Sequence, residues 1–273
     1  MNYVFTKSKI GYSHLKNNKL CQDFSASYTD SERTIITCCD GHGGDAYIRS
    51  NIGSQFASDA VITIFKTITA KSIKKLSEAE LINKIKLEIL CEWNKLVERH
   101  YSKYHFKKNE TISLNEHNLD SLRDNYTKAY GTTMSGAMLY NKKLYIVGIG
   151  DTECLLVKNG ELIKALNTED DPVANITYSM CQEDAFNYIK VNIVDFKNYD
   201  GVILCTDGLS SPYQSYDNFK NSFIIPLFRD LINLKNTSGI DSFIDGIALK
   251  HGVGDDVSLS FIIKDKLTKK YYK

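Results

Sequence analysis

One turn motif constrains this chain more than any other stretch: Asp-Gly-His-Gly-Gly at 40–44, directly after an apolar run from Thr34 to Cys39. The run is typical of a buried strand, and the glycines predict a sharp turn whose backbone can approach a ligand. From Asp45 onward, apolar residues recur at spacings of three or four, which predicts a helix. An isolated Asp-Gly pair is most often only a turn, but this strand, turn and helix together make a frame for a metal-dependent site.

Length and composition favour one globular domain that spans residues 1–273. The chain is long enough to bury a substantial core, and it holds only three prolines and no Gly/Ser-rich tract that would mark a linker. Residues 106–124 are polar and rich in Asn, with a weak apolar pattern. We interpret them as an excursion from the domain rather than as a second domain.

Charge and cysteine content narrow the cellular setting. The 34 basic residues nearly balance the 33 acidic ones, which leaves a net charge of +1. This charge does not indicate binding to nucleic acid or to an anionic membrane, both of which favour an excess of basic residues. The first residues lack the pattern of a signal peptide, and no apolar run is long enough to span a bilayer. Seven cysteines without a Cys-x-x-Cys pair suit a reducing compartment and argue against a zinc site. We expect a cytoplasmic protein with no nucleic-acid or membrane partner.

The N-terminal half predicts strands followed by two amphipathic helices. Residues 2–12 alternate loosely between apolar and polar, which indicates a first strand. The runs 24–28 and 34–39 predict neighbouring strands joined by a polar turn. A capping box, Ser77-x-x-Glu80, starts a second helix, which we expect to pack beside the helix from Asp45 on one face of a sheet.

The C-terminal half predicts mostly antiparallel strands. Four strand-like runs, joined in part by a two-residue hairpin turn at Asn159-Gly160, indicate a meander: 132–140, 144–149, 154–157 and 162–166. A further pair, 188–194 with 202–206, precedes helical patterns at 222–234 and 240–250 and a last strand at 257–263. Antiparallel strands with segregated helices predict an α+β layered sandwich rather than a doubly wound sheet. No Gly-x-Gly-x-x-Gly or Walker-type motif supports nucleotide binding.

Four aspartates share one local pattern, because each lies where an apolar strand begins or ends: Asp23, Asp40, Asp207 and Asp255. If these strand ends meet at one edge, the carboxylates cannot all stay ionised without cations between them. Mg²⁺ and Mn²⁺ prefer such oxygen ligands. Two of these ions, roughly 3.5–4 Å apart, can lower the pKa of a bridging water and bind the oxygens of a phosphoryl group in an in-line displacement.

Six short motifs, in this order and spacing, resemble the motif series of the type 2C metal-dependent serine/threonine protein phosphatases. They are Gln22-Asp23, the turn at 40–44, Gly131-Thr132-Thr133, the segment 148–152, the segment 206–209 and the segment 255–258. The resemblance covers nearly the whole chain and is to bacterial-type stand-alone catalytic domains. It implies a four-layer α-β-β-α sandwich, with two antiparallel sheets flanked by helix pairs and two Mn²⁺ or Mg²⁺ ions at one end.

The same resemblance implies a set of metal ligands. Asp40 matches the carboxylate that bridges both ions, and the carbonyl of Gly41 matches a ligand of one of them. Asp207 and Asp255 match ligands of the other ion. Asp23 matches the aspartate of the family's Glu-Asp pair, which contacts the centre directly or through water; Gln22 replaces the Glu.

The resemblance also assigns the proton donor and leaves the phosphate contact open. His42 matches the residue proposed to protonate the leaving oxygen, and an imidazole suits that role near neutral pH. Many relatives bind the substrate phosphate with an Arg that this chain lacks. Lys19 or His14 is the candidate substitute, and for His14 a plain surface role is equally compatible with the sequence.

A third ion would lack its usual ligands in this chain. Relatives hold it with aspartates at two places where this chain has Ala129 and Ser211. Asp124 lies nearby in the sequence and is the candidate replacement. We interpret Gly131-Thr132-Thr133 and Gly150-Asp151 as architectural, a strand start and a tight turn.

These residues favour a phosphatase that hydrolyses phosphoserine and phosphothreonine in proteins by direct attack of a metal-bridging water. Its substrates would be phosphorylated proteins, in opposition to a Ser/Thr kinase. One alternative is a pseudophosphatase that binds a phosphoprotein or another partner without turnover. Another is a hydrolase of a small phosphoester, which would prefer such an ester over a phosphopeptide. Retention of all four aspartates and His42 favours an active enzyme.

Overall fold

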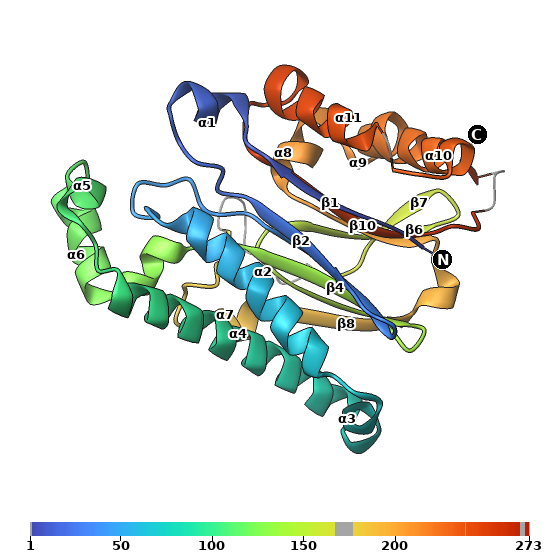
Figure 1. The fold of residues 1–273 in the computed structure, drawn as a ribbon, viewed down its shortest axis with the longest axis horizontal. Coiled ribbons are helices and arrows are strands. Elements are labelled where there is room, and N and C mark those ends of the chain that lie inside the picture. The colour runs from blue at the N-terminus through green and yellow to red at the C-terminus, as the bar shows by residue number, and fades with distance from the viewer. Residues whose placement is uncertain (1, 167–176, 238, 268–270, 273) are drawn as a thin grey trace.

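Two antiparallel β-sheets pack face to face in the computed structural model, which describes residues 2–166, 177–237, 239–267 and 271–272 (Figure 1). The first sheet has the strand order β1-β10-β9-β6-β7: β1 (Asn2–Lys9), β10 (Val257–Lys264), β9 (Gly201–Cys205), β6 (Glu153–Lys158) and β7 (Glu161–Lys164). The pairing of β1 with β10 extends from Asn2 opposite Lys264 to Lys9 opposite Val257. The first and last strands of the described chain therefore lie side by side.

The second sheet has the order β2-β3-β4-β5-β8: β2 (Phe24–Thr29), β3 (Arg33–Cys39), β4 (Met134–Tyr140), β5 (Lys143–Ile149) and β8 (Lys190–Asp195). Phe24 lies opposite Cys39, which confirms that β2 and β3 are antiparallel neighbours. Asp23 and Asp40 therefore flank the same end of this strand pair.

Helices cover the outer face of each sheet, so the predicted α+β sandwich is confirmed (Figure 1). The second sheet carries α2 (Ser50–Thr67) and α4 (Glu78–Lys103), and the first carries α10 (Ile225–Leu234) and α11 (Ile240–Gly246). Shorter helices occur in the segments that connect these elements along the chain: α1 (Tyr12–Lys16), α3 (Ala70–Lys75), α5 (Lys108–Thr111), α6 (Glu116–Asp124), α7 (Ala185–Tyr188), α8 (Asp207–Ser210) and α9 (Tyr216–Phe219).

Apolar side chains fill three layers. One layer lies between the two sheets and includes Ile36, Leu204 and Ile262. A second lies under α2 and α4 and includes Trp93, whose indole donates a hydrogen bond to the carbonyl of Gly53. The third lies under α10 and α11. Each sheet is thus packed with apolar side chains on both faces.

The predicted capping box is confirmed at the start of α4. The hydroxyl of Ser77 accepts a hydrogen bond from the Glu80 backbone, and the Glu80 carboxylate accepts one from the Ser77 backbone. The other predicted helix begins later than expected, at Ser50 rather than Asp45. Residues 45–49 instead form a loop that is tied to neighbouring segments, since Arg49 donates to the backbone carbonyl of Tyr104 and to the carboxylate of Glu110.

The predicted hairpins β4-β5 and β6-β7 are confirmed, the second with its turn at Asn159-Gly160. Their union in one meander is wrong, because β5 and β6 lie in different sheets. Gly150, with φ of +91°, begins the turn that carries the chain from one sheet to the other. A side chain at Gly150 would meet Thr133 at 2.6 Å, so the crossing needs glycine. The expected pair of 188–194 with 202–206 is wrong for the same reason, since β8 pairs with β5 and β9 pairs with β10 and β6.

The polar excursion at 106–124 contains α5 and α6 and is held to the body by the ion pair between Glu110 and Arg49. Its description as part of one domain stays a prediction. Among the described residues, no helix combines the length and apolar character needed to cross a bilayer.

Candidate metal centre and catalytic site

The four predicted aspartates lie near one another, because the charges of Asp23, Asp207 and Asp255 all act on Asp40. Asp207 begins α8, which lies toward the same end of the sandwich as α1 (Figure 1). Asp40 follows β3 and Asp23 precedes β2 in the second sheet, while Asp207 follows β9 and Asp255 precedes β10 in the first. Two sheets therefore contribute two carboxylates each. The expectation that these strand ends lie close together is confirmed.

Burial and mutual repulsion act strongly on these carboxylates. Burial, followed by the charges of Asp23 and Asp207, raises the pKa of Asp40 well above its usual range. Burial is also the largest cause of the raised pKa of Asp207, with the charges of Asp151 and Asp255 adding to it. A cluster of this kind favours either protonation or a bound cation.

Asp151 belongs to this cluster and was missed as a site residue. Its negative charge raises the pKa of both Asp40 and Asp207. It lies in the crossing from β5 to β6, where its carboxylate accepts a hydrogen bond of 2.7 Å from Thr177. The signal was present in the sequence, because Gly150-Asp151 ends an apolar strand as the other site aspartates do, but the turn was interpreted as part of a meander.

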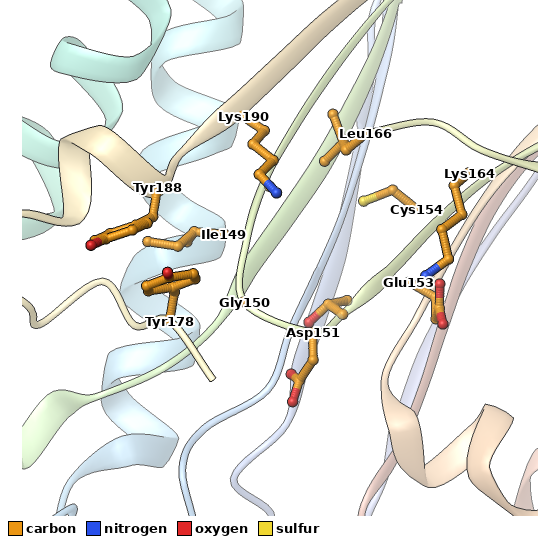
Figure 2. A pocket seen from close by; sticks show the side chains of 12 residues that line it. Ile149, Gly150, Asp151, Glu153, Cys154, Lys164, Leu166, Tyr178, Tyr188 and Lys190 are labelled. Atoms are coloured by element: carbon orange, nitrogen blue, oxygen red, sulfur yellow. The ribbon is translucent and has the colours of Figure 1, made fainter. Parts of the chain in front are cut away.

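A cavity of about 190 Å³ adjoins Asp151 (Figure 2). The stacked rings of Tyr178 and Tyr188, with centroids 3.6 Å apart, form one wall. Lys190 extends into the cavity from β8, and the Asp151 carboxylate extends away from it (Figure 2). Asp151 therefore lies between the two, since it lines this cavity and also belongs to the aspartate cluster.

Asp23 and Asp256 form the buried floor of the cluster, and each is anchored by backbone or hydroxyl donors. Thr206 donates a 2.8 Å hydrogen bond to Asp23, whose pKa is raised well above its usual range by burial and then by the charge of Asp256. The carboxylate of Asp256 accepts bonds from the backbone of Gly11, at 2.8 Å, and of Gln22, at 2.6 Å. Asp256 thus ties the chain on both sides of α1 to the start of β10.

The backbone of the 40–44 turn is fixed by the Gly131-Thr132-Thr133 motif. Thr133 exchanges two hydrogen bonds with Asp40, because its hydroxyl accepts from the Asp40 backbone and its own backbone donates to the Asp40 carbonyl. Gly41 forms a β-bridge with Thr132. The architectural role expected for this motif is what the structure shows.

His42 is half-buried at the rim of the cluster. Burial lowers the pKa of its imidazole, and the charge of Asp151 opposes that shift. Its ring lies edge-on to that of Tyr47, with centroids 4.8 Å apart. The imidazole is therefore close enough to Asp151 for that charge to act on its pKa, and it remains partly exposed.

The three remaining candidates occupy different surroundings. His14 lies against the acidic residues, with its Nδ1 3.0 Å from Asp256 and its Nε2 3.9 Å from Asp255. Lys19 is exposed and lines a cavity of about 240 Å³ that also includes Gly43 and Gly44 of the turn. Asp124 ends α6 on the surface, separated from Gly131 by a 3-10 turn at 126–130. The charge of Asp151 acts on Asp40 and Asp207, whereas Asp124 is not among the residues whose charges do most to raise the pKa of these two.

The donor set fits divalent cations in its chemistry. Carboxylate oxygens and a backbone carbonyl are hard ligands, and the charges that raise the pKa of Asp40 are all negative. Gln22 adds a buried amide oxygen that has no hydrogen-bond partner among the described residues. Its nitrogen donates to Ser50 and to the carbonyl of His42. In the part of the chain that the structure describes, no three acidic, Cys or His side chains yet converge on one point.

Comparison with known proteins gives one family match. A family model described as Protein phosphatase 2C matches residues 10–241. No curated protein matches the chain.

Solved structures with similar folds cover nearly the whole chain. The serine/threonine phosphatase Stp1 from Staphylococcus aureus is 15% identical with a TM-score of 0.58, and the alignment covers 96% of this chain and 95% of that one. The catalytic domain of the serine threonine protein phosphatase PstP, in complex with two manganese ions, is 14% identical with a TM-score of 0.57, covering 96% and 97%. PppA of Pseudomonas aeruginosa, described as a key regulatory component of T6SS, is 14% identical with a TM-score of 0.59, also covering 96% and 97%. At these identities the likeness shows a shared fold.

Proposed function

Because the chain belongs to the protein phosphatase 2C family, we infer that it is a serine/threonine protein phosphatase acting on phosphorylated proteins. The observation that carries this inference is the meeting of aspartates from both sheets at one end of the sandwich, with the pKa of Asp40 raised by burial and by its neighbours. No observation favours the pseudophosphatase or the small-ester alternative.

We propose that Asp40, the carbonyl of Gly41, Asp207, Asp255 and Asp23 hold two Mn²⁺ or Mg²⁺ ions. Such ions supply Lewis acidity and lower the pKa of bound water. The negative charge gathered by the strand ends supports this assignment, and so does the unpartnered amide oxygen of Gln22.

We propose Asp151, rather than Asp124, as the residue for any third ion. Asp151 is close enough to Asp40 and Asp207 to raise the pKa of both. The charge of Asp124 is not among the largest causes of the raised pKa of Asp40 or of Asp207. Asp124 is also exposed, at the end of α6.

Two further side chains have roles toward the substrate in this proposal. His42 protonates the leaving oxygen of serine or threonine, since an alkoxide is a poor leaving group without a proton. Lys19 attracts the phosphoprotein from the cavity beside Gly43 and Gly44. His14 is the weaker candidate for phosphate contact, because its ring already lies against the carboxylates of Asp255 and Asp256.

The proposed activity also suggests a partner and a compartment for the protein. We propose that the enzyme opposes a Ser/Thr kinase and works in the cytoplasm. The seven cysteines are all free thiols in the structure, which supports a reducing compartment.

Substrate comparison tests the proposed class of reaction. Phosphate release is measured with Mn²⁺ on phosphoserine and phosphothreonine peptides, a phosphotyrosine peptide and a phosphodiester. The proposal predicts turnover of the first two well above the others. Preference for the diester, or binding of the phosphopeptides without turnover, would contradict it and support one of the two alternatives.

A further inference from the structure

The ring of Tyr47 packs edge-on against the imidazole of His42. The ring centroids are 4.8 Å apart and the planes are inclined at 63°. Tyr47 lies in the loop before α2, where its backbone donates to the carbonyl of Gly44 at 2.9 Å and accepts from Ser50 at 3.1 Å. The loop conformation therefore holds the tyrosine ring at a fixed place beside His42.

Two glycines form the slot that the Tyr47 ring occupies. A Cβ atom on Gly131 would lie 2.5 Å from the Tyr47 ring and 3.0 Å from Cδ2 of His42. A Cβ atom on Gly44 would lie 3.2 Å from the same ring. Both aromatic rings thus rest on the bare α-carbon of Gly131, and any larger residue there would displace them.

The backbone of His42 is fixed, but its side chain is oriented by packing. The His42 amide donates to the carbonyl of Gly131 at 3.1 Å, and its carbonyl accepts from the Gln22 side chain at 3.1 Å. Among the described residues, no hydrogen bond to a ring nitrogen orients the imidazole. The edge contact with Tyr47 is therefore a packing interaction that restricts rotation of the ring.

We propose that Tyr47 is a positioning residue for His42, whose ring keeps the imidazole in the orientation from which it protonates the leaving oxygen. This inference rests on the proposed function and on the assigned role of His42. The contact uses the ring of Tyr47 and not its hydroxyl, so phenylalanine should serve equally well. A misplaced proton donor slows only those substrates whose leaving group needs the proton.

The test compares two substrates in the Mn²⁺-loaded enzyme. A phosphothreonine peptide has an alkoxide leaving group, whereas p-nitrophenyl phosphate has an activated one that departs without a proton. Positioned general acids contribute about 10²- to 10⁴-fold, so Tyr47→Ala should lower kcat for the peptide by about 10-fold or more. The aryl phosphate should lose less than about 3-fold on the same grounds. Tyr47→Phe should retain both rates, and His42→Ala sets the largest loss expected.

A second variant tests the same contact without removing the tyrosine. Gly131→Ala is compatible with the backbone, whose φ of −56° any residue adopts, but its methyl group would displace both rings. It should reproduce the peptide-selective loss even if Tyr47→Ala fails to fold. The matched control is Tyr126→Ala, which removes a tyrosine stacked on Tyr101 at 4.2 Å. That control should leave both rates as in the wild type.

The possible outcomes separate this inference from the proposed function. Equal losses on both substrates in folded Tyr47→Ala and Gly131→Ala would overturn the positioning role, and so would a Tyr47→Phe variant as impaired on the peptide as Tyr47→Ala. Wild-type enzyme that hydrolyses neither substrate with Mn²⁺ would instead contradict the proposed function itself. Thermal unfolding of each variant shows which of them are folded.

Discussion

The hydroxyl of Thr206 donates a 2.8 Å hydrogen bond to the carboxylate of Asp23, and this bond joins the two sheets at the site. Thr206 follows β9 of the first sheet, and Asp23 precedes β2 of the second. The same hydroxyl accepts a bond from the backbone of Ser258 at 3.0 Å. The aspartate cluster therefore lies where a hydrogen bond joins the two sheets, and its charge state should affect the stability of the sandwich.

Stability without metal should fall as pH rises. The pKa of Asp23 and that of Asp40 are raised by burial, so the folded state holds these protons more tightly than the unfolded state does. Their favourable contribution is complete below the ordinary Asp pKa and is lost as pH rises through the raised values. Mn²⁺ should offset that loss, so the increase in Tm on adding Mn²⁺ should be larger at pH 8 than at pH 5.5.

Calorimetry of the chelated and Mn²⁺-loaded protein checks this dependence on pH. In the chelated protein, Asp23→Asn should flatten the fall of Tm with pH, because the variant lacks one of the buried carboxylates. An increase in Tm that is the same at both pH values would contradict the account of the cluster.

Asp256 should stabilise the fold, whereas its neighbour Asp255 should be needed for turnover and not for stability. Asp256→Ala leaves the buried backbone donor of Gly11 and the partly buried one of Gln22 without their acceptor, which should cost about 2–4 kcal/mol of unfolding free energy. The side chain of Asp255 is 53% exposed, and Asp255→Ala should leave stability within about 0.5 kcal/mol while abolishing turnover.

Urea unfolding of the two chelated variants, together with phosphate release from a phosphopeptide, separates these roles. Similar unfolding free energies for the two variants would show that Asp256 does not anchor the chain around α1. Full activity in Asp255→Ala would remove Asp255 from the ligand set.

Arg49 should hold the 106–124 excursion to the body of the protein. Its buried guanidinium donates to the Glu110 carboxylate and to the carbonyls of Tyr104 and His105. Arg49→Met leaves Glu110 without its cation, and breaking a buried pair costs about 3–5 kcal/mol. That range is an upper bound here, because Glu110 is 26% exposed.

A surface ion pair of the same excursion is the matched control for Arg49. Arg123→Met breaks the pair with Asp120, in which both side chains are well exposed, and should cost less than about 1 kcal/mol. Chemical denaturation compares the two variants. Equal effects would mean that Arg49 contributes no more than an exposed ion pair does.

Local sequence patterns predicted the parts of the fold that depend on neighbouring residues. The capping box of Ser77 and Glu80 marked the start of α4, and the apolar runs located most strands. The placement of Asp23 and Asp40 at one end also followed from local order, because β2 and β3 are joined by a short turn. These elements are fixed by interactions within a few residues, which the sequence shows directly.

Long-range pairing was not predictable from local order. Nothing near Gly150 shows that β5 and β6 enter different sheets, so the meander was assumed and Asp151 was missed. The start of α2 at Ser50 likewise depends on distant partners of Arg49 and Tyr47 rather than on the apolar stripe. Strand partners and loop anchors are chosen by tertiary packing, which overrides local periodicity.

The most direct test of the metal-dependent phosphatase is phosphate release from a phosphothreonine peptide after chelation and again after Mn²⁺ or Mg²⁺ is restored. Asp40→Asn and Asp207→Asn are assayed in parallel. The account predicts release that stops on chelation, returns with metal, and is absent in both variants although they remain folded. In the chelated state, Asp40→Asn should unfold at a higher temperature than the wild type, because one buried carboxylate is gone. Release that persists in the chelated protein, or unchanged turnover in either variant, would contradict the central claim.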